Sequence, residues 1–273
     1  MDSTVGDPVQ QEPPLLSCRS VSKYFGALAA VQDLSFDARP GEVLGIGGPN
    51  GAGKTTLFDV ISGLNPASAG TIQFAGHDIA AWRPHRIFRQ GIARTFQFNA
   101  GFDTLTVTEN VILGAFFQRQ KGLLPPMRFD RKSRQQAEEA LALVGLSDSA
   151  NATVKHLPVY HRKLLMLAGA LASAPTLVLM DEPVGGLNPH EIDEIMEIVG
   201  RIRQSGVTII LIEHVMRFLV TLSDRIIIMH HGEKIYEGSA EGLVKDKTVV
   251  DVYLGEGASG RLEHILQEAQ SGG

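Results

Sequence analysis

The sequence predicts an α/β fold built on a parallel sheet, with a mainly helical insertion in the middle of the chain. Three observations lead to this prediction. Short apolar runs alternate with helical patterns, a glycine-rich loop joins the first of these runs to a helix, and residues 98–160 contain few strand-like runs. Strands that alternate with helices are typical of a parallel sheet with crossover helices.

Hydrophobic periodicity predicts the elements one by one. Four apolar runs are expected as buried strands, the last of them folded into a hairpin: 42–48, 176–182, 207–213 and 225–238. Apolar residues at i, i+3 and i+4 predict amphipathic helices between them, at 54–64, 190–204 and 215–223. The charged stretch 131–146 has the same helical spacing.

These patterns divide the chain into parts. We expect a disordered tail over residues 1–14, an α/β core formed by 15–97 and 162–250, a helical subdomain over 98–161, and a C-terminal tail over 251–273. The core is discontinuous because the helical subdomain is inserted into it.

Composition restricts the function classes. A chain of 273 residues with 44% hydrophobic residues can bury an ordinary core, and its single cysteine, Cys18, excludes an internal disulfide framework and suits a reducing cytosol. The net charge of −5 argues against nucleic acid as the main partner. We expect no signal peptide and no membrane span, because no stretch approaches the roughly 20 apolar residues that a span requires.

A phosphate site is predicted where "GPNGAGKT" follows an apolar run and precedes a helical pattern. Glycines let the backbone curl tightly and point its N–H groups inward, and the helix adds its positive N-terminal end. Lys54 is expected to reach the β- and γ-phosphates, and Thr55 to ligate Mg²⁺. The predicted nucleotide-binding residues are Gly48, Pro49, Asn50, Gly51, Ala52, Gly53, Lys54, Thr55 and Thr56.

An acidic pair follows the apolar run "TLVLM". Asp181 is expected at the sheet edge, where it can hold Mg²⁺ through water, and Glu182 can act as general base on an attacking water. A solvated turn is the alternative for two adjacent acids, and the phosphate loop makes it the weaker one.

Three further segments point to one family. "RTFQ" at 94–97 precedes the helical insertion, "GGLNP" at 185–189 follows the acidic pair, and "LIEH" at 211–214 ends the next strand, while no guanine-reading [NT]-K-x-D motif is present. In this order and spacing the chain resembles the ATP-binding cassette (ABC) ATPases over about residues 15–255. The resemblance implies a RecA-like P-loop NTPase core with a parallel sheet, an antiparallel β part at the N-terminal side and a helical subdomain insertion.

The resemblance also implies individual roles. Gln97 is expected to sense Mg²⁺ and the γ-phosphate, and His214 to contact the γ-phosphate and orient the attacking water. Phe25 corresponds to the aromatic residue that stacks on adenine, with Tyr24 as second choice, and Asn188 stands where many cassettes have aspartate. Each has a plain structural alternative: a core aromatic, a helix start or a surface amide.

Longer matches are similar to the cytosolic ATPase subunits of branched-chain amino-acid importers. They include "KYFGALAAVQDLSF", "LTVTENV", "DEPVGGLNP" and "VYLGEG". The ATPases of urea-type importers and of lipopolysaccharide export are near relatives, so the resemblance indicates the cargo less strongly than the activity.

One family segment is degenerate. ABC ATPases bind ATP between two cassettes, one of which supplies an L-S-x-G-Q signature, and the register of the following helix places Leu157–His161 on it. Pro158 has no N–H to donate, and Tyr160 replaces a glycine that lets backbone approach phosphate. Losing one preorganised donor typically costs about 10²–10³ in rate. A simple helix start is the alternative, and a rearrangement that makes His161 or Arg162 a substitute donor stays open.

The sequence therefore predicts an ATP- and Mg²⁺-dependent ATPase subunit, cytoplasmic and peripheral on the inner face of the cell membrane. Its expected partners are transmembrane permease subunits and a second, unlike ABC ATPase subunit with an intact signature. The alternatives are a regulatory subunit that binds ATP with little hydrolysis and, least favoured, a soluble ABC protein of DNA repair or translation.

Overall fold

The computed structural model describes residues 12–96, 101–119 and 129–254. Most of the expected N-terminal tail, the residue Gln97 and the last 19 residues of the expected C-terminal tail lie outside these ranges.

A six-stranded sheet forms the centre of the molecule, in the order β10-β9-β3-β8-β7-β6. Its strands are β3 (Val43–Gly47), β6 (Ile92–Arg94), β7 (Leu177–Asp181), β8 (Thr208–Ile212), β9 (Arg225–His230) and β10 (Glu233–Gly238). All neighbours pair in parallel except β9 and β10, which form an antiparallel hairpin at the edge. The strands and the hairpin predicted from the apolar runs are therefore confirmed.

Both faces of the sheet are buried at β3, β7 and β8, which explains why these strands are almost continuously apolar. Successive side chains of a strand point to opposite faces. In β7, Val178 and Met180 accordingly join the core beneath helices α5, α6 and α7, whereas Leu177 and Leu179 join a second core that also contains α1 and the N-terminal strands.

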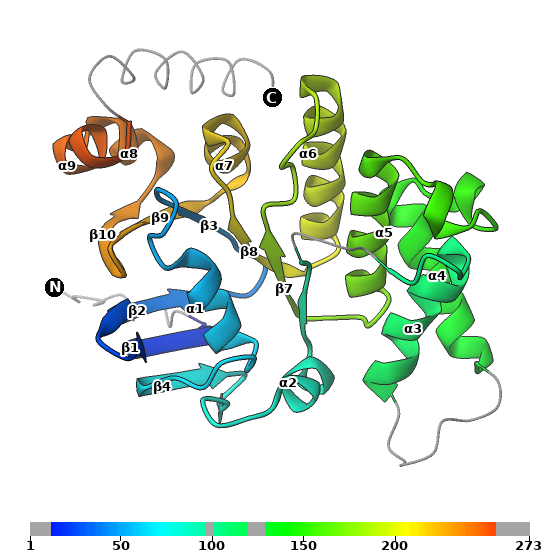
Figure 1. Cartoon of the computed structure of the whole chain (residues 1–273), viewed down its shortest axis with the longest axis horizontal. Coiled ribbons are helices and arrows are strands. Elements are labelled where there is room, and N and C mark those ends of the chain that lie inside the picture. The colour runs from blue at the N-terminus through cyan, green and yellow to red at the C-terminus, as the bar shows by residue number, and fades with distance from the viewer. Residues whose placement is uncertain (1–11, 97–100, 120–128, 255–273) are drawn as a thin grey trace, which may run out of the picture.

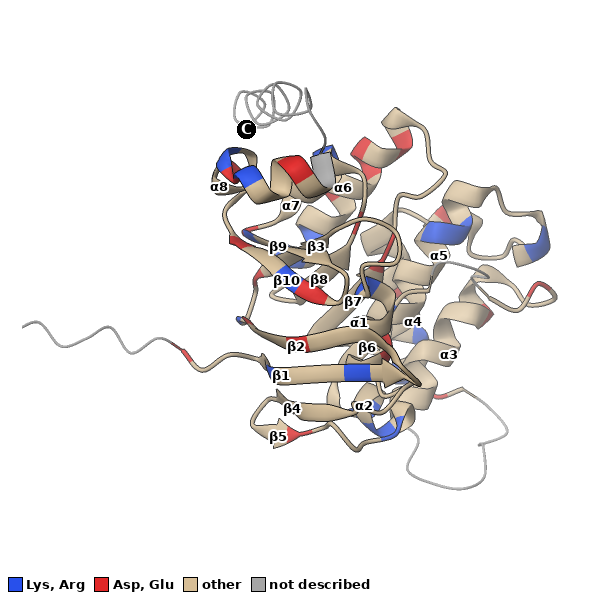
Figure 2. Ribbon diagram, turned by 60° about the vertical axis from the view of Figure 1, so that its left-hand side comes forward, with Lys and Arg blue, Asp and Glu red and all other residues tan. Residues whose placement is uncertain are grey.

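A second, antiparallel sheet covers the opposite side of α1 (Lys54–Ile61). It consists of β1 (Leu16–Phe25), β2 (Leu28–Ala38), β4 (Ala69–Phe74) and β5 (His77–Asp78), in the order β2-β1-β4-β5. Figures 1 and 2 show this sheet as a layer on one side of α1, with the six-stranded sheet on the other. The antiparallel part implied by the family resemblance is thus present.

Helices surround the central sheet. They are α2 (Pro84–Gln90), α3 (Val107–Arg119), α4 (Arg131–Val144), α5 (Val159–Leu171), α6 (Pro189–Gln204), α7 (Met216–Leu222), α8 (Ala240–Lys245) and α9 (Lys247–Val249). Figure 1 shows α3, α4 and α5 gathered on one side of the molecule, away from β1 and β2. Among the described residues, no helix is long and apolar enough to cross a membrane.

Helix α5 crosses the boundary expected between residues 161 and 162. It packs against α3 and α4 and leads directly into β7. The helical layer and the sheet that carries the acidic pair are therefore mechanically joined by one helix.

Candidate nucleotide site

The glycine-rich loop joins β3 to α1 at the carboxyl edge of the central sheet. Gly48, Gly51 and Gly53 have φ values of 141°, 81° and 97°, which favour glycine. A Cβ on Gly48 would lie 2.2 Å from the Met229 carbonyl oxygen, and one on Gly53 would lie 2.1 Å from the Ala30 carbonyl oxygen. These two glycines are therefore required both by backbone conformation and by close packing.

Lys54 reaches back over this loop. Its Nζ donates hydrogen bonds to the carbonyl oxygens of Gly48 at 2.7 Å and Pro49 at 2.9 Å. Burial lowers the pKa of Lys54, although the nearby carboxylates of Glu182 and Asp181 oppose that shift. The ammonium is thus held inside the loop, facing acidic groups.

The first turn of α1 presents its free N–H groups at the same place. The N-cap residue, Gly53, has no side chain that could accept from these N–H groups, and the first turn contains no acidic residue. Thr55 is exposed and Thr56 is half-buried on this turn. Such a helix start is a favourable position for an anion.

Asp181 and Glu182 lie at the carboxyl end of β7, which β8 separates from β3 in the central sheet. Asp181 ends β7 and is buried, and its Oδ2 accepts from Arg94 at 2.9 Å. Burial raises the pKa of Asp181 despite that arginine. Glu182 has a φ of 48°, and its N–H donates to the Ile212 carbonyl at 3.0 Å. An unusual backbone conformation of this kind clusters at functional sites.

Lys163 of α5 helps to hold that conformation. Its Nζ donates to the Glu182 carbonyl oxygen at 3.2 Å, and the Gly185 N–H donates to the same oxygen at 3.3 Å. Burial lowers the pKa of Lys163. The helix that carries the degenerate segment therefore contacts the backbone of the acidic pair directly.

His214 follows β8 and approaches Glu182. Its Nδ1 lies 3.9 Å from Glu182 Oε1 and 3.7 Å from Glu213 Oε2, and its side chain is exposed on the other side. The structure thus brings the predicted histidine, base and phosphate-loop lysine to one edge of the sheet.

The buried carboxylate of Glu213 connects two backbone segments at this edge of the sheet. Its side chain is 0% exposed; Oε1 accepts from the Val184 N–H at 3.0 Å, and Oε2 accepts from the N–H groups of His214 at 3.0 Å and Val215 at 3.2 Å. Burial raises the pKa of Glu213. One carboxylate therefore ties the segment after Glu182 to the segment that carries His214.

The donor set at this edge suits Mg²⁺ bound mainly by phosphate and water. Within the described ranges, no cluster of three or more His, Cys, Asp or Glu could hold a metal ion by itself. Mg²⁺ in nucleotide sites typically uses one or two protein ligands, with phosphates and waters completing the octahedron. The Asp181 carboxylate and the Thr55 hydroxyl fit that requirement, and Gln97 lies outside the described residues.

The predicted aromatic residue lies at the end of β1. Phe25 and Tyr24 are about half exposed, and Lys23 Nζ lies 4.9 Å from the centroid of the Phe25 ring. Residue Ala30 of the paired strand β2 touches Gly53, so this hairpin packs on the phosphate loop. Neighbouring residues of a strand face opposite sides, so one of the two rings can face the loop.

The degenerate segment forms the start of α5. Pro158 is the N-cap residue and makes no side-chain cap, Val159 is 63% exposed, and Tyr160 packs against the core. Burial and the nearby carboxylate of Glu194 on α6 raise the pKa of Tyr160. Arg162 is occupied within the chain, because it pairs with Asp103 at 3.0 Å and donates to two carbonyl oxygens.

Asn188 has a local structural function. Its side chain accepts from the Glu191 N–H at 3.1 Å, while Glu191 accepts from the Asn188 N–H at 2.9 Å, which forms a capping box at the start of α6. The asparagine thus fixes the segment between the acidic pair and α6.

Sequence reasoning missed Lys163, Glu213 and Arg94 as parts of this site. Arg94 stood inside the quoted segment "RTFQ", and Glu213 stood inside "LIEH". For Arg94 and Glu213 the signal was a charged residue in or next to a buried strand, which needs a partner when it is buried. Lys163 lies in α5, where no such signal marks it.

A parallel sheet with a phosphate loop after β3 and an acidic residue ending β7 defines a P-loop NTPase. The family model described as ABC transporter matches residues 31–185, and the chain belongs to that family as one of its ATP-binding subunits. It is 33% identical to the high-affinity branched-chain amino acid transport ATP-binding protein LivG of Escherichia coli, over 89% of this chain and 98% of the relative. It is 32% identical to BraF of Pseudomonas aeruginosa, a protein of the same description, with the same coverage.

Solved structures agree with this assignment. A nucleotide-free ATP-binding cassette from an ABC transporter superposes with a TM-score of 0.81 at 29% identity, covering 89% of this chain and all of that one. The ADP conformation of such a cassette superposes with a TM-score of 0.80 at the same identity and coverage.

Proposed function

We propose that this chain hydrolyses ATP to power uptake of branched-chain or related amino acids through separate membrane subunits, on the cytoplasmic side of the membrane. The observation that carries the proposal is the meeting of Lys54, Glu182 and His214 at one edge of the sheet. The names of the relatives support the cargo class, and urea or lipid remain the alternative cargoes.

We assign each site residue a role in ATP binding or hydrolysis from its position. The loop N–H groups and Lys54 bind the phosphates, and Thr55 and Asp181 would hold Mg²⁺, which supplies charge neutralisation when bound. Glu182 accepts the proton of the attacking water, and His214 orients that water beside the terminal phosphate. Phe25 is proposed to stack on adenine, and Gln97 to contact the metal and the terminal phosphate.

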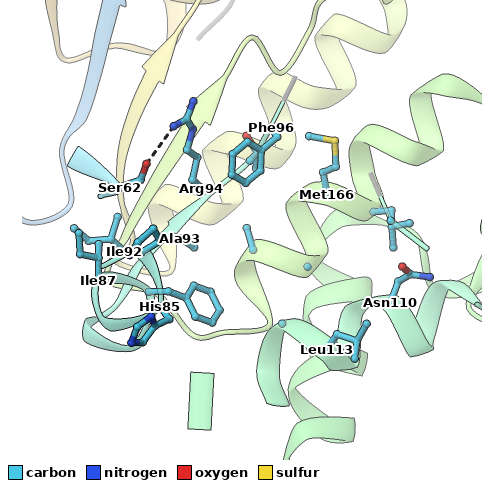
Figure 3. Close-up of a pocket in the computed structure, with 18 of the residues that line it drawn as sticks. Ser62, His85, Ile87, Ile92, Ala93, Arg94, Phe96, Asn110, Leu113 and Met166 are labelled. Atoms are coloured by element: carbon cyan, nitrogen blue, oxygen red, sulfur yellow. Dashed lines mark hydrogen bonds between the residues drawn. The ribbon is translucent and has the colours of Figure 1, made fainter. Parts of the chain in front are cut away.

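An apolar groove supports docking of a permease segment. It has a volume of about 490 Å³ and separates the α/β core from the helical layer. Figure 3 shows Ile87, Ile92 and Ala93 on one wall and Leu113 and Met166 on the other. The occupant we propose is a short apolar segment of the membrane subunit, since this groove lies next to the residues that precede Gln97.

The start of α5 supports an unlike ATPase partner. Pro158 offers no hydroxyl, and the exposed Val159 places an apolar surface where a signature would bind the phosphate across a dimer. A homodimer would contain two impaired sites. A partner with an intact signature would complete the site formed by this chain's own phosphate loop.

Turnover of mixtures tests this proposal. We expect little hydrolysis by the chain alone and a strong increase when a cassette with an intact signature and the permease subunits are added. Robust hydrolysis by the purified chain alone would contradict the need for an unlike partner.

The degenerate signature also favours a second candidate, a regulatory subunit that binds ATP with little hydrolysis. Glu182→Gln in the assembled complex separates the two. Loss of a general base typically costs about 10²–10⁴ in rate, so we expect at least a hundredfold drop in turnover at this chain's site with ATP binding retained. Equal rates for the variant and the wild type would establish the regulatory function instead.

A further inference from the structure

We propose that Arg94 is a positioning residue that holds the Asp181 carboxylate for the divalent cation and connects it to the apolar groove. The inference rests on the proposed function, because it assumes that Asp181 serves a nucleotide-bound metal. Within the part of the chain that the structure describes, the side-chain hydrogen bonds of Arg94 go to Asp59, Ser62 and Asp181, so its action on the metal would be through the Asp181 carboxylate.

The sheet register brings Arg94 to the metal carboxylate. Arg94 ends β6 and pairs in parallel with Leu179 of β7, two residues before Asp181. Its Nη2 donates to Asp181 Oδ2 at 2.9 Å, and the next residue, Thr95, accepts a hydrogen bond from the Asp181 N–H at 3.3 Å. Both the side chain and the backbone of Asp181 are therefore fixed from the β6 edge.

The same guanidinium is anchored to α1. Its Nη1 donates to Asp59 Oδ1 at 2.7 Å and to Ser62 Oγ at 3.2 Å. Arg94 thus bridges the helix that follows the phosphate loop and the strand that carries the metal carboxylate. A planar guanidinium suits this task, because it can bind two carboxylates in fixed directions whereas an ammonium is a point charge.

Burial makes these contacts strong and costly to lose. The Arg94 side chain is only 6% exposed, and that of Asp181 is 5% exposed. One cation is shared by the carboxylates of Asp59 and Asp181, so the cluster keeps a formal charge of −1 (two acids and one base), which favours an approaching cation. Removing Arg94 would take this counter-charge away from the buried Asp181 and the half-buried Asp59.

The other side of Arg94 faces the groove. Arg94 lines the cavity together with Phe96, and the Phe96 ring centroid lies 5.0 Å from the guanidinium carbon. Figure 3 shows the two side chains next to each other, with the hydrogen bond from Arg94 to Ser62. Phe96 is 48% exposed, so an occupant of the groove would contact the ring that lies beside Arg94.

Arg94 is therefore the side chain common to the groove and the metal carboxylate. A groove occupant that shifts Phe96 or Arg94 must alter the contact with Asp181, because packed interiors transmit displacements. This gives a physical route by which a membrane subunit would influence metal binding.

The test measures Mn²⁺ binding to the full chain in the presence of ADP, by electron paramagnetic resonance. Partners that orient a metal-ligating carboxylate typically contribute about 10–100-fold in metal affinity. We expect Arg94→Met to lower Mn²⁺ affinity by about that factor, while ADP affinity in EDTA stays within about twofold of wild type. Arg86→Met is the matched control, because Arg86 lies on α2, stacks over the Trp82 ring and is not part of the cluster.

Arg94→Lys covers the case in which Arg94→Met does not fold. It keeps the charge but cannot hold both carboxylates in the same geometry, so we expect a Mn²⁺ affinity between those of Arg94→Met and wild type, at least about threefold below the latter. Unchanged Mn²⁺ affinity in a folded Arg94 variant overturns the inference. If wild type itself binds no Mn²⁺ with ADP, the proposed function fails instead.

Discussion

Glu213 shows how one buried carboxylate can organise two loops. It accepts backbone hydrogen bonds from Val184 and from His214 and Val215, with no exposed surface of its own. In Glu213→Gln the amide nitrogen would face at least one of these N–H groups. An unsatisfied buried donor costs about 1–3 kcal/mol, so we expect that loss in the free energy of unfolding, measured by urea denaturation.

The effect of Glu213→Gln on ATP turnover separates a role in positioning His214 from a role in stability alone. Because Glu213 holds His214 and the segment after Glu182 together, we expect Glu213→Gln to lower kcat in the assembled complex by about tenfold or more, with the KM for ATP nearly unchanged. Glu138→Gln is the control, because this substitution removes the same charge at a residue that is exposed on α4. A Glu213 variant that loses stability but keeps full kcat would show that this carboxylate is purely structural.

At the scale of elements, α3 and α5 approach each other unusually closely. A Cβ on Gly114 would lie 2.2 Å from the Gly169 carbonyl oxygen, so Gly114→Ala requires the two helices to separate. Overpacking of this kind costs about 1–3 kcal/mol. We expect a destabilisation of that size by thermal or urea unfolding.

Gly200→Ala provides the comparison within one protein. Gly200 lies in α6, and a Cβ added there would meet no atom within 4 Å, so alanine should stabilise that helix by about 0.5–1 kcal/mol. If Gly114→Ala lowers the free energy of unfolding and Gly200→Ala raises it, the contact at Gly114, and not helix propensity, determines the effect of alanine there. Equal changes in the free energy of unfolding for the two substitutions would mean that α3 and α5 pack less closely than the structure indicates.

For the whole molecule, the proposed need for an unlike partner can be tested at the start of α5. Pro158→Ser together with Tyr160→Gly restores a hydroxyl and a close backbone approach to phosphate at this position. Since one preorganised donor is worth about 10²–10³ in rate, we expect at least a tenfold rise in hydrolysis by the chain alone. The same pair of changes combined with Glu182→Gln should show no rise.

The Tyr160 change also has a structural cost. Tyr160 is half-buried and packs on the core, so glycine should lower the melting temperature. An unchanged rate in a folded double variant would contradict the explanation that the degenerate signature limits hydrolysis.

Much of the fold follows from local pattern. Most strands of the central sheet were predicted because strands buried on both faces read as short apolar runs, as in Leu177–Asp181 and Thr208–Ile212. The edge strand β6 was not predicted, because its three residues are too few to form such a run. The phosphate loop was predictable because its backbone conformation and close packing require glycine at fixed positions. The strands β1 and β2 were not assigned from pattern, since polar and apolar residues mix in them and their pairing is irregular.

The sequence by itself determined the class of site: a phosphate loop, an acidic pair and a histidine, each next to the strand that carries it. It also predicted that Leu157–His161 lacks the signature chemistry, because Pro158 has no hydroxyl where the signature has serine. Only the tertiary structure decided which groups hold these residues in place. Arg94 meets Asp59 and Asp181, and Glu213 meets Val184, because strand register brings distant segments to one sheet edge, and no local pattern encodes that register.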